Sequence, residues 1–169
     1  RELANGEDKV LDDLLSAYIR LMEQAVEKDG YLYTWNQIYF PKVRWKNLRI
    51  EHELYCMGHF IEAGVSHFNT TGSRRLLDLA IRTADLITGE FLNDRRKRFP
   101  GHQEIEIALV RLADATGNDT YRRMARQFLD RRGQQKFHAF RMLGTFLSHL
   151  KRSRHVARVE KDTDNDTLG

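Results

Sequence analysis

The feature that most constrains the fold is a helical period in the apolar side chains. Apolar residues recur every three or four positions in five segments, which is the spacing of an amphipathic α-helix. These segments cover residues 10–25, 54–68, 77–87, 105–112 and 121–129. No stretch alternates apolar and polar residues for long enough to predict a β-strand, and the two prolines, Pro41 and Pro100, fall between the helical segments. The sequence therefore predicts an all-α fold.

The chain also repeats itself, because a shift of 45 residues places Thr71-Gly72 on Thr116-Gly117. A period of this length, with one helical hairpin per unit, is typical of an α-solenoid or a closed toroid of helix pairs. The two Thr-Gly turns are tight, whereas residues 28–49 and 89–101 form long connections that should gather at the opposite rim. Long loops on a rigid scaffold are where a binding site is usually built.

Composition excludes several classes of protein. With 41% hydrophobic and 31% charged residues, the chain resembles a soluble globular domain, and no apolar run approaches the roughly 18 residues of a membrane span. The single cysteine, Cys56, excludes an internal disulfide and a metal site built from several cysteines. The net charge of +4 is concentrated in residues 94–98 and 151–154, and short clusters like these are usually solvated loops or helix ends. We expect no membrane or nucleic-acid partner, and the absence of a signal sequence favours a cytoplasmic location.

Two histidines occupy the same place in neighbouring hairpins. His52 and His102 each lie near the first turn of an expected helix, at the rim that carries the long loops. A helix N-terminus disfavours the cationic form of an imidazole, and a neutral ring there can bond hydroxyl groups. Ordinary packing of parallel helices would hold the two rings roughly 10 Å apart, which fits one sugar ring. A lone histidine at such a place is usually a cap or a surface residue, but the repetition weakens that alternative.

His59 and Cys56 have competing interpretations. His59 shares a helix face with His52, so it either lines the site or bonds a backbone carbonyl in the core. A zinc site made of His52, Cys56 and His59 is disfavoured, because three ligands along one straight helix rarely converge on an ion. We therefore expect Cys56 to be a small packing residue.

Glutamates and aromatic residues at the rim are further candidates for lining the site. The glutamates near the starts of the second and fourth helical segments are Glu51, Glu53, Glu104 and Glu106, and the loop aromatics are Trp35, Tyr39 and Trp45. Paired carboxylates serve acid–base chemistry in glycosidases, but glutamates also favour helix starts, and we expect the structural role for Glu104. An aromatic face such as that of Trp35 either stacks on a sugar or pins the loop to the scaffold.

Longer strings of residues resemble a known family. They are Asp29-Gly30-Tyr31-Leu32, Arg44-Trp45-Lys46-Asn47-Leu48, HELYCMGHFIEA at 52–63, PGHQEIE at 100–106 and Asp130-Arg131-Arg132-Gly133. In order, spacing and loop position they resemble glycoside hydrolase family 127, the β-L-arabinofuranosidases and their relatives, over residues 8–134. The resemblance implies an (α/α)6 barrel, which fits the hairpin repeat, followed by β-sandwich domains. It also implies that His52 and His102 contact a bound L-arabinofuranoside.

The resemblance further implies a chemistry whose residues lie beyond this chain. Family members retain configuration and use a cysteine thiolate held on zinc as the nucleophile. Further cysteines and a glutamate bind the zinc, and a separate glutamate is the general acid/base. Zinc would deprotonate the thiol and so activate it. Because Cys56 belongs to the HELYC string and does not match the nucleophile, we expect no catalytic residue, metal ligand or cofactor here.

The barrel expected from the resemblance is incomplete. It needs six hairpins, and the sequence contains about two and a half. We expect residues 1–7 to be a linker or disordered, 8–134 a partial barrel, 135–160 a divergent basic helix and 161–169 a disordered tail. Uncovered inner faces forgo about 1.5–3 kcal/mol of burial per apolar side chain, which favours self-association.

Three functions compete on this basis. The first is a fragment of a glycoside hydrolase that is inactive alone. The second is a stand-alone helical module that binds carbohydrate or protein without catalysis. The third is a basic scaffold that contacts nucleic acid or an acidic partner through residues 151–158.

Overall fold

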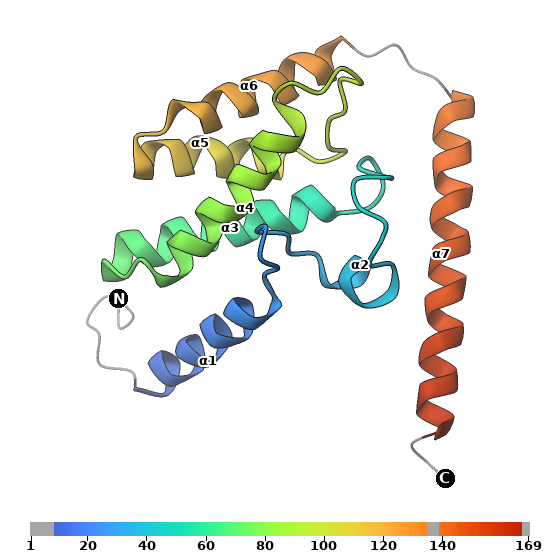
Figure 1. Cartoon of the computed structure of the whole chain (residues 1–169), viewed down its shortest axis with the longest axis horizontal. Helices are drawn as coiled ribbons and strands as arrows, with labels where there is room; N and C mark the ends of the chain where they lie inside the picture. The colour runs from blue at the N-terminus through green and yellow to red at the C-terminus, as the bar shows by residue number, and fades with distance from the viewer. Residues whose placement is uncertain (1–8, 135–138, 167–169) are drawn as a thin grey trace.

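The computed structural model describes residues 9–134 and 139–166, and every regular element within these ranges is a helix. The helices are α1 (Lys9–Ala25), α2 (Thr34–Tyr39), α3 (Glu53–Thr71), α4 (Arg75–Phe91), α5 (Glu104–Thr116), α6 (Asp119–Gly133) and α7 (Ala139–Asp166). Two antiparallel pairs, α3–α4 and α5–α6, stack on each other, while α1 and α7 lie on opposite sides of α2 (Figure 1). The all-α prediction and the hairpin repeat are therefore confirmed.

Glycine turns close both hairpins at the expected places. α3 ends at Gly72 with φ of 71°, and α5 ends at Gly117 with φ of 73°. Both residues adopt the left-handed conformation that favours glycine, and each N–H donates to the carbonyl four residues earlier at 2.8 Å. These two short turns leave the long connections, residues 26–52 and 92–103, together at the other end of the hairpins.

The core lies between α3 and its two neighbours. α3 packs on both α4 and α5, and α5 packs on α6. The largest fully buried side chains on these helices are Leu54, Met57, Ile61, Leu77, Ile87, Phe91, Ile105, Leu109, Leu112, Met124 and Phe128. Burying each such side chain stabilises the fold by about 1.5–3 kcal/mol relative to exposure. Gly64 brings α4 close, since a Cβ atom there would lie 2.8 Å from the Cβ of Ala80.

The structure departs from the sequence expectations in two segments. α2 lies inside the first long connection, where no helix was expected. α7 continues to Asp166, so the segment expected to be a disordered tail from residue 161 is helical as far as that residue. The expected linker at 1–7 and residues 167–169 lie outside the described residues.

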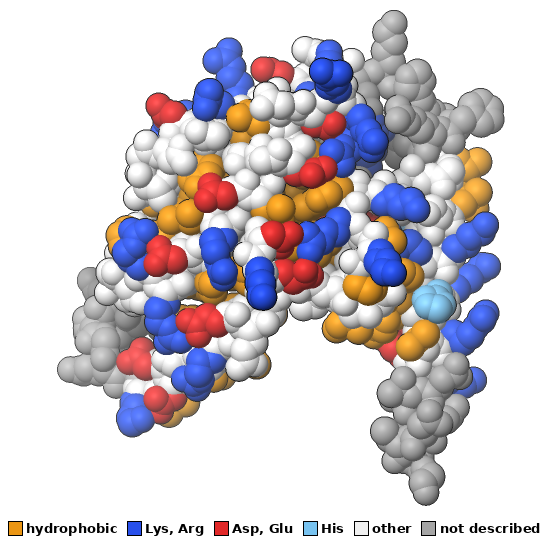
Figure 2. Space-filling model, viewed as in Figure 1, with side chains coloured by type: hydrophobic (Ala, Val, Ile, Leu, Met, Phe, Trp, Pro, Cys, Tyr) orange, Lys and Arg blue, Asp and Glu red, His pale blue; other side chains and the backbone are white. Residues whose placement is uncertain are grey.

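The described surface carries charged side chains and an apolar groove. On the face shown in Figure 2, Lys and Arg side chains follow one edge of α7, whereas α1 carries charges of both signs. A groove of about 560 Å³ runs between α1 and α3, and Leu15, Tyr18, Met22, Trp35 and Phe60 are among the residues that line it. None of the described helices is both long enough and apolar enough to cross a membrane.

Candidate sugar-binding site

A buried carboxylate holds the first long loop on α3. Glu53, the first residue of α3, is fully buried and accepts hydrogen bonds from the Tyr31 hydroxyl at 2.6 Å and the Asn36 amide at 2.9 Å. The backbone N–H of Trp45 also donates to it at 3.0 Å. Burial raises the pKa of Glu53, and these hydrogen bonds offset only part of that rise. Since all three donors come from residues 31–45, Glu53 fixes the loop and is not a free acid–base group.

A glycine contact holds the second long loop against the first. The Gly101 N–H donates to the Leu48 carbonyl at 2.9 Å, and a Cβ atom on Gly101 would lie only 2.1 Å from the Arg49 carbonyl oxygen. Arg131 and Arg132 each donate to a backbone carbonyl of this second loop at 3.0 Å. The PGHQEIE and DRRG strings thus have a direct structural role, because together they fix the loop that precedes α5.

These loops bring the two candidate histidines to one pocket. His52 is the residue before α3, and His102 lies two residues before α5. Both line a pocket of about 150 Å³ that we call the histidine pocket, with Leu48, Arg49, Glu51, Tyr55, Pro100 and Gly101. Tyr55 lies between the histidines, with its ring centre 5.4 Å from that of His52 and 4.7 Å from that of His102. The two imidazoles are therefore no more than about 10 Å apart, the separation expected from helix packing.

A backbone hydrogen bond orients the His102 ring. The Glu104 backbone N–H donates to His102 Nδ1 at 3.2 Å, so Nδ1 is the acceptor in this contact. A neutral imidazole in this arrangement carries its proton on Nε2, which is then the donor available to a ligand. His52 is exposed, and its side chain makes no capping hydrogen bond to α3. Both rings have hydrogen-bonding capacity left for a hydroxylated ligand.

Two further glutamates at this rim, Glu51 and Glu106, form ion pairs with arginines. Glu51 is 4% exposed and accepts two hydrogen bonds from Arg152 of α7, at 2.6 and 2.7 Å. Glu106 is 3% exposed and accepts one from Arg132 at 2.6 Å. Buried ion pairs of this kind fix the elements that they join. Neither carboxylate faces the histidine pocket as a free acid–base group.

His59 and Glu104 meet below the histidine pocket. His59 is exposed, so the expectation of a core histidine is wrong, and its Nδ1 lies 3.2 Å from Glu104 Oε1. Side-chain atoms of His59, Glu62 and Glu104 lie within 4.8 Å of one another, and no other group of this kind occurs in residues 9–134 and 139–166. His52 and Cys56 do not belong to this group of side chains.

Cys56 and Trp35 both lie outside the histidine pocket. Cys56 is exposed on α3, so it is not the packing residue that we expected. Trp35, on α2, is half-buried and lines the apolar groove beside Cys56 and His59. Trp45 is the aromatic that pins the loop, because its buried ring packs edge-on against Tyr31 at 5.3 Å and Phe91 at 5.2 Å.

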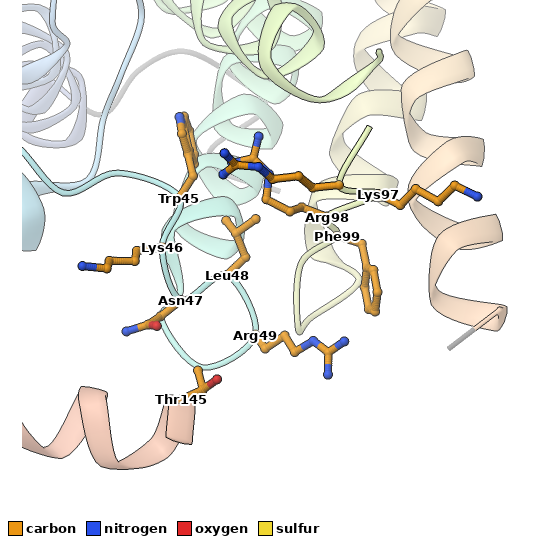
Figure 3. Close-up of a pocket in the computed structure, with 10 residues that line it drawn as sticks. Trp45, Lys46, Asn47, Leu48, Arg49, Lys97, Arg98, Phe99 and Thr145 are labelled. Carbon is orange, nitrogen blue, oxygen red and sulfur yellow. The ribbon is translucent and has the colours of Figure 1, made fainter. Parts of the chain in front are cut away.

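A second pocket at the same rim is lined by cationic residues. It has a volume of about 170 Å³, and residues 45–49 and 96–99 form most of its wall. Figure 3 shows that Lys46 and Lys97 point away from each other and that Arg98 points toward Trp45. Arg98 is already bonded to Asp94 at 2.8 Å and to Glu90 at 2.7 Å. An anion site would require these cations to converge on a common point, and they do not.

Tyr55 was missed as a site residue in the sequence. It lies three residues after His52, on the same helix face, and its ring touches three histidine rings, those of His52, His59 and His102. The signal was present in the HELY string, but the contact with His102 depends on how α5 docks on α3. Sequence spacing alone does not give that docking.

Comparison with known proteins identifies the family of the chain. The family model described as β-L-arabinofuranosidase, GH127 catalytic domain, matches residues 2–167, which extends the likeness past the limit of 8–134 expected from the motifs. A non-reducing end β-L-arabinofuranosidase from Bifidobacterium longum subsp. longum is 35% identical over 138 residues, covering 78% of this chain and 21% of that protein.

Solved structures give the same result. A GH127 β-L-arabinofuranosidase from Geobacillus stearothermophilus T6 superposes with a TM-score of 0.75 at 44% identity, covering 80% of this chain and 22% of that one. A second GH127 β-arabinofuranosidase superposes with a TM-score of 0.71 at 38% identity, covering 79% and 23%. The chain thus spans about a fifth of the length of the relatives that it matches.

Proposed function

Because the chain belongs to the GH127 β-L-arabinofuranosidase catalytic-domain family, we propose that it forms one side of a binding site for an L-arabinofuranoside. The observation that carries the proposal is the histidine pocket, where His52 and His102 from neighbouring hairpins flank Tyr55. The long loops at this rim are rigidly held, by Glu53 and by the contact of Gly101 with Arg49. A rigid rim of this kind suits a small ligand.

Each group at the pocket has a defined task in the proposed binding. His102 donates from Nε2 to a sugar hydroxyl, because Nδ1 is occupied by the Glu104 N–H. His52, at the start of α3, bonds a second hydroxyl of the same sugar. The Tyr55 ring between them supplies an apolar surface for the C–H face of the sugar.

We further propose that this chain binds the sugar without hydrolysing it. The zinc-held thiolate implied by the family resemblance needs several cysteines, and the sequence contains Cys56 alone. Cys56 lies on the apolar groove and belongs to no group of ligands among the described residues, so it does not fit that centre. Glu51, Glu53 and Glu106 are occupied by arginines or by loop donors. No step of hydrolysis is therefore assigned to these residues.

Calorimetry with L-arabinose tests the binding site. We expect the parent chain to bind L-arabinose, and His52→Ala and His102→Ala each to weaken binding roughly 2- to 13-fold, the value of one neutral hydrogen bond. His67→Ala, on the same helix but outside the pocket, is the matched control and should bind like the parent. Unchanged affinity in both pocket variants would remove the histidines from the site.

An activity assay tests the second part of the proposal. The chain is incubated with a methyl β-L-arabinofuranoside, with and without added zinc, and released L-arabinose is measured. We expect no release in either case. Turnover by the chain would show that it contains a complete catalytic centre.

A further inference from the structure

One cluster of side chains near the histidine pocket is not used by the proposed sugar binding. His59 and Glu62 lie one turn apart on α3, and Glu104 is the first residue of α5. One ligand atom from each lies within 4.8 Å of the other two. We propose that His59, Glu62 and Glu104 form a binding site for a divalent transition-metal ion such as Zn²⁺ or Mn²⁺. The ligands of this site are one imidazole and two carboxylates, with no thiolate among them.

The cluster depends on unusually close packing of two helices. A Cβ atom on Gly58 would lie 2.9 Å from Glu104 Cγ and 3.1 Å from the backbone of residues 104 and 105. Glycine at 58 therefore lets the first turn of α5 lie directly against α3, next to His59. The Tyr55 ring packs edge-on against the His59 ring at 4.5 Å and limits its orientation. The scaffold thus holds ligands from two helices in place before any ion arrives, which favours binding.

Buried oxygen atoms in the cluster lack hydrogen-bond donors. Glu104 is 9% exposed, and neither its Oε1 atom nor Glu62 Oε1 accepts a hydrogen bond, although both atoms are buried. Glu104 Oε1 lies 3.2 Å from His59 Nδ1, and Glu62 Oε1 lies 2.8 Å from the Arg111 guanidinium. Buried carboxylate oxygens without donors are costly, and a bound cation would satisfy them.

The charges around the cluster are compatible with a cation. Burial raises the pKa of Glu62, and the adjacent Glu104 carboxylate raises it further, against the opposing effect of Arg111. Two carboxylates in contact repel each other unless a proton or a metal ion lies between them. The Arg111 side chain is 62% exposed, and exposed ion pairs are weak, so Arg111 can move away when an ion binds Glu62.

The donor set indicates the class of ion. One imidazole nitrogen and two carboxylate oxygens suit Zn²⁺ or Mn²⁺, whereas Mg²⁺ and Ca²⁺ prefer oxygen ligands alone. The His59 side chain is 52% exposed, so the ion has a path from solvent and an open coordination position that water can fill.

Calorimetric titration of the full chain, freed of metal by a chelator, tests the site with ZnCl₂ and MnCl₂ separately. We expect one ion to bind per chain. His59→Ala and Glu104→Gln should each weaken binding by about tenfold or more, because each removes a ligand. His67→Ala and Cys56→Ser are matched controls on the same helix and should bind as tightly as the parent.

A fourth variant separates a metal site from a merely structural network of ion pairs. Arg111→Gln should tighten metal binding, because it frees Glu62 from its competing partner. If the four charged groups only stabilise one another, Arg111→Gln would not tighten it, and that result overturns the proposal. Absence of binding by the parent chain, or equal affinity in the parent, His59→Ala and Glu104→Gln, would also overturn it. Far-ultraviolet circular dichroism of each variant confirms that the helices are intact.

Discussion

Substitution of Gly101 by alanine should destabilise the chain by displacing one long loop from the other. The new Cβ atom would lie 2.1 Å from the Arg49 carbonyl oxygen and 2.7 Å from its carbon, and backbone atoms cannot rotate aside as a side chain can. The hydrogen bond from the Gly101 N–H to Leu48 would also be strained. Overpacking of this kind costs about 1–3 kcal/mol. In a chain of 169 residues each kcal/mol lowers the melting temperature by about 2–4 °C, so we expect a decrease of about 2–12 °C.

Gly89→Ala is the matched control for this prediction. Gly89 lies within α4, and no atom lies within 4 Å of the position of its added Cβ. Alanine there should stabilise the helix by about 0.5–1 kcal/mol, so the two glycine-to-alanine changes have opposite signs. Melting temperatures are measured by circular dichroism at 222 nm. If Gly101→Ala were as stable as the parent, the reasoning about the loop contact would be refuted.

Three further predictions concern the groups that fix the loops and the glycine that lets α5 pack on α3. Tyr31→Phe should lower the free energy of unfolding by about 1–3 kcal/mol, measured by urea unfolding, because it removes the hydroxyl that donates to buried Glu53. The control is Tyr18→Phe, which should have little effect because Tyr18 is exposed. Burial favours a raised pKa for Asp94, but hydrogen bonds from Arg98 and from backbone N–H groups outweigh it and hold the pKa of Asp94 below its usual value. The stabilisation by the ionised Asp94 is therefore complete above about pH 4 and is lost as the pH falls through the lowered pKa. The free energy of unfolding of Asp94→Asn should therefore fall less steeply with decreasing pH than that of the parent. An equal slope of unfolding free energy against pH in the two proteins would contradict this. Gly58→Ala should weaken metal binding, because the added Cβ atom would move α5 away from His59. An unchanged affinity for Zn²⁺ in this variant would contradict the packing argument.

Much of the fold follows from the sequence because it depends on local patterns. The apolar period places α3, α4, α5 and α6, and glycines at 72 and 117 end two helices in the left-handed conformation. α2 was missed because six residues are too few to show a helical period, and its position depends on the hydrogen bond that Asn36 of α2 donates to Glu53, 17 residues later in the chain. The end of α7 differs from the expectation because polar residues alone do not end a helix, and α7 continues to Asp166.

The site was only partly predictable for the same reason. His52 and His102 could be placed at one rim, since unequal loop lengths fix the direction of the helices. Of the two places that the sequence left open for His59, the core is excluded, because the side chain is exposed and lies beside Glu104 of α5. The meeting of His59 with Glu104 depends on the close helix contact at Gly58, which cannot be derived from the spacing of either residue within its own helix.

The most direct test of the central claim is a nuclear magnetic resonance titration of the chain labelled with ¹⁵N in its histidine rings. A methyl β-L-arabinofuranoside is added, and the imidazole signals are followed and assigned by single substitutions. The account predicts that the ring signals of His52 and His102 shift together with one binding curve, while those of His67 and His155, which do not line the histidine pocket, stay in place. Absence of any shift, or shifts confined to His67 and His155, would contradict the claim that the rim of α3 and α5 binds the sugar.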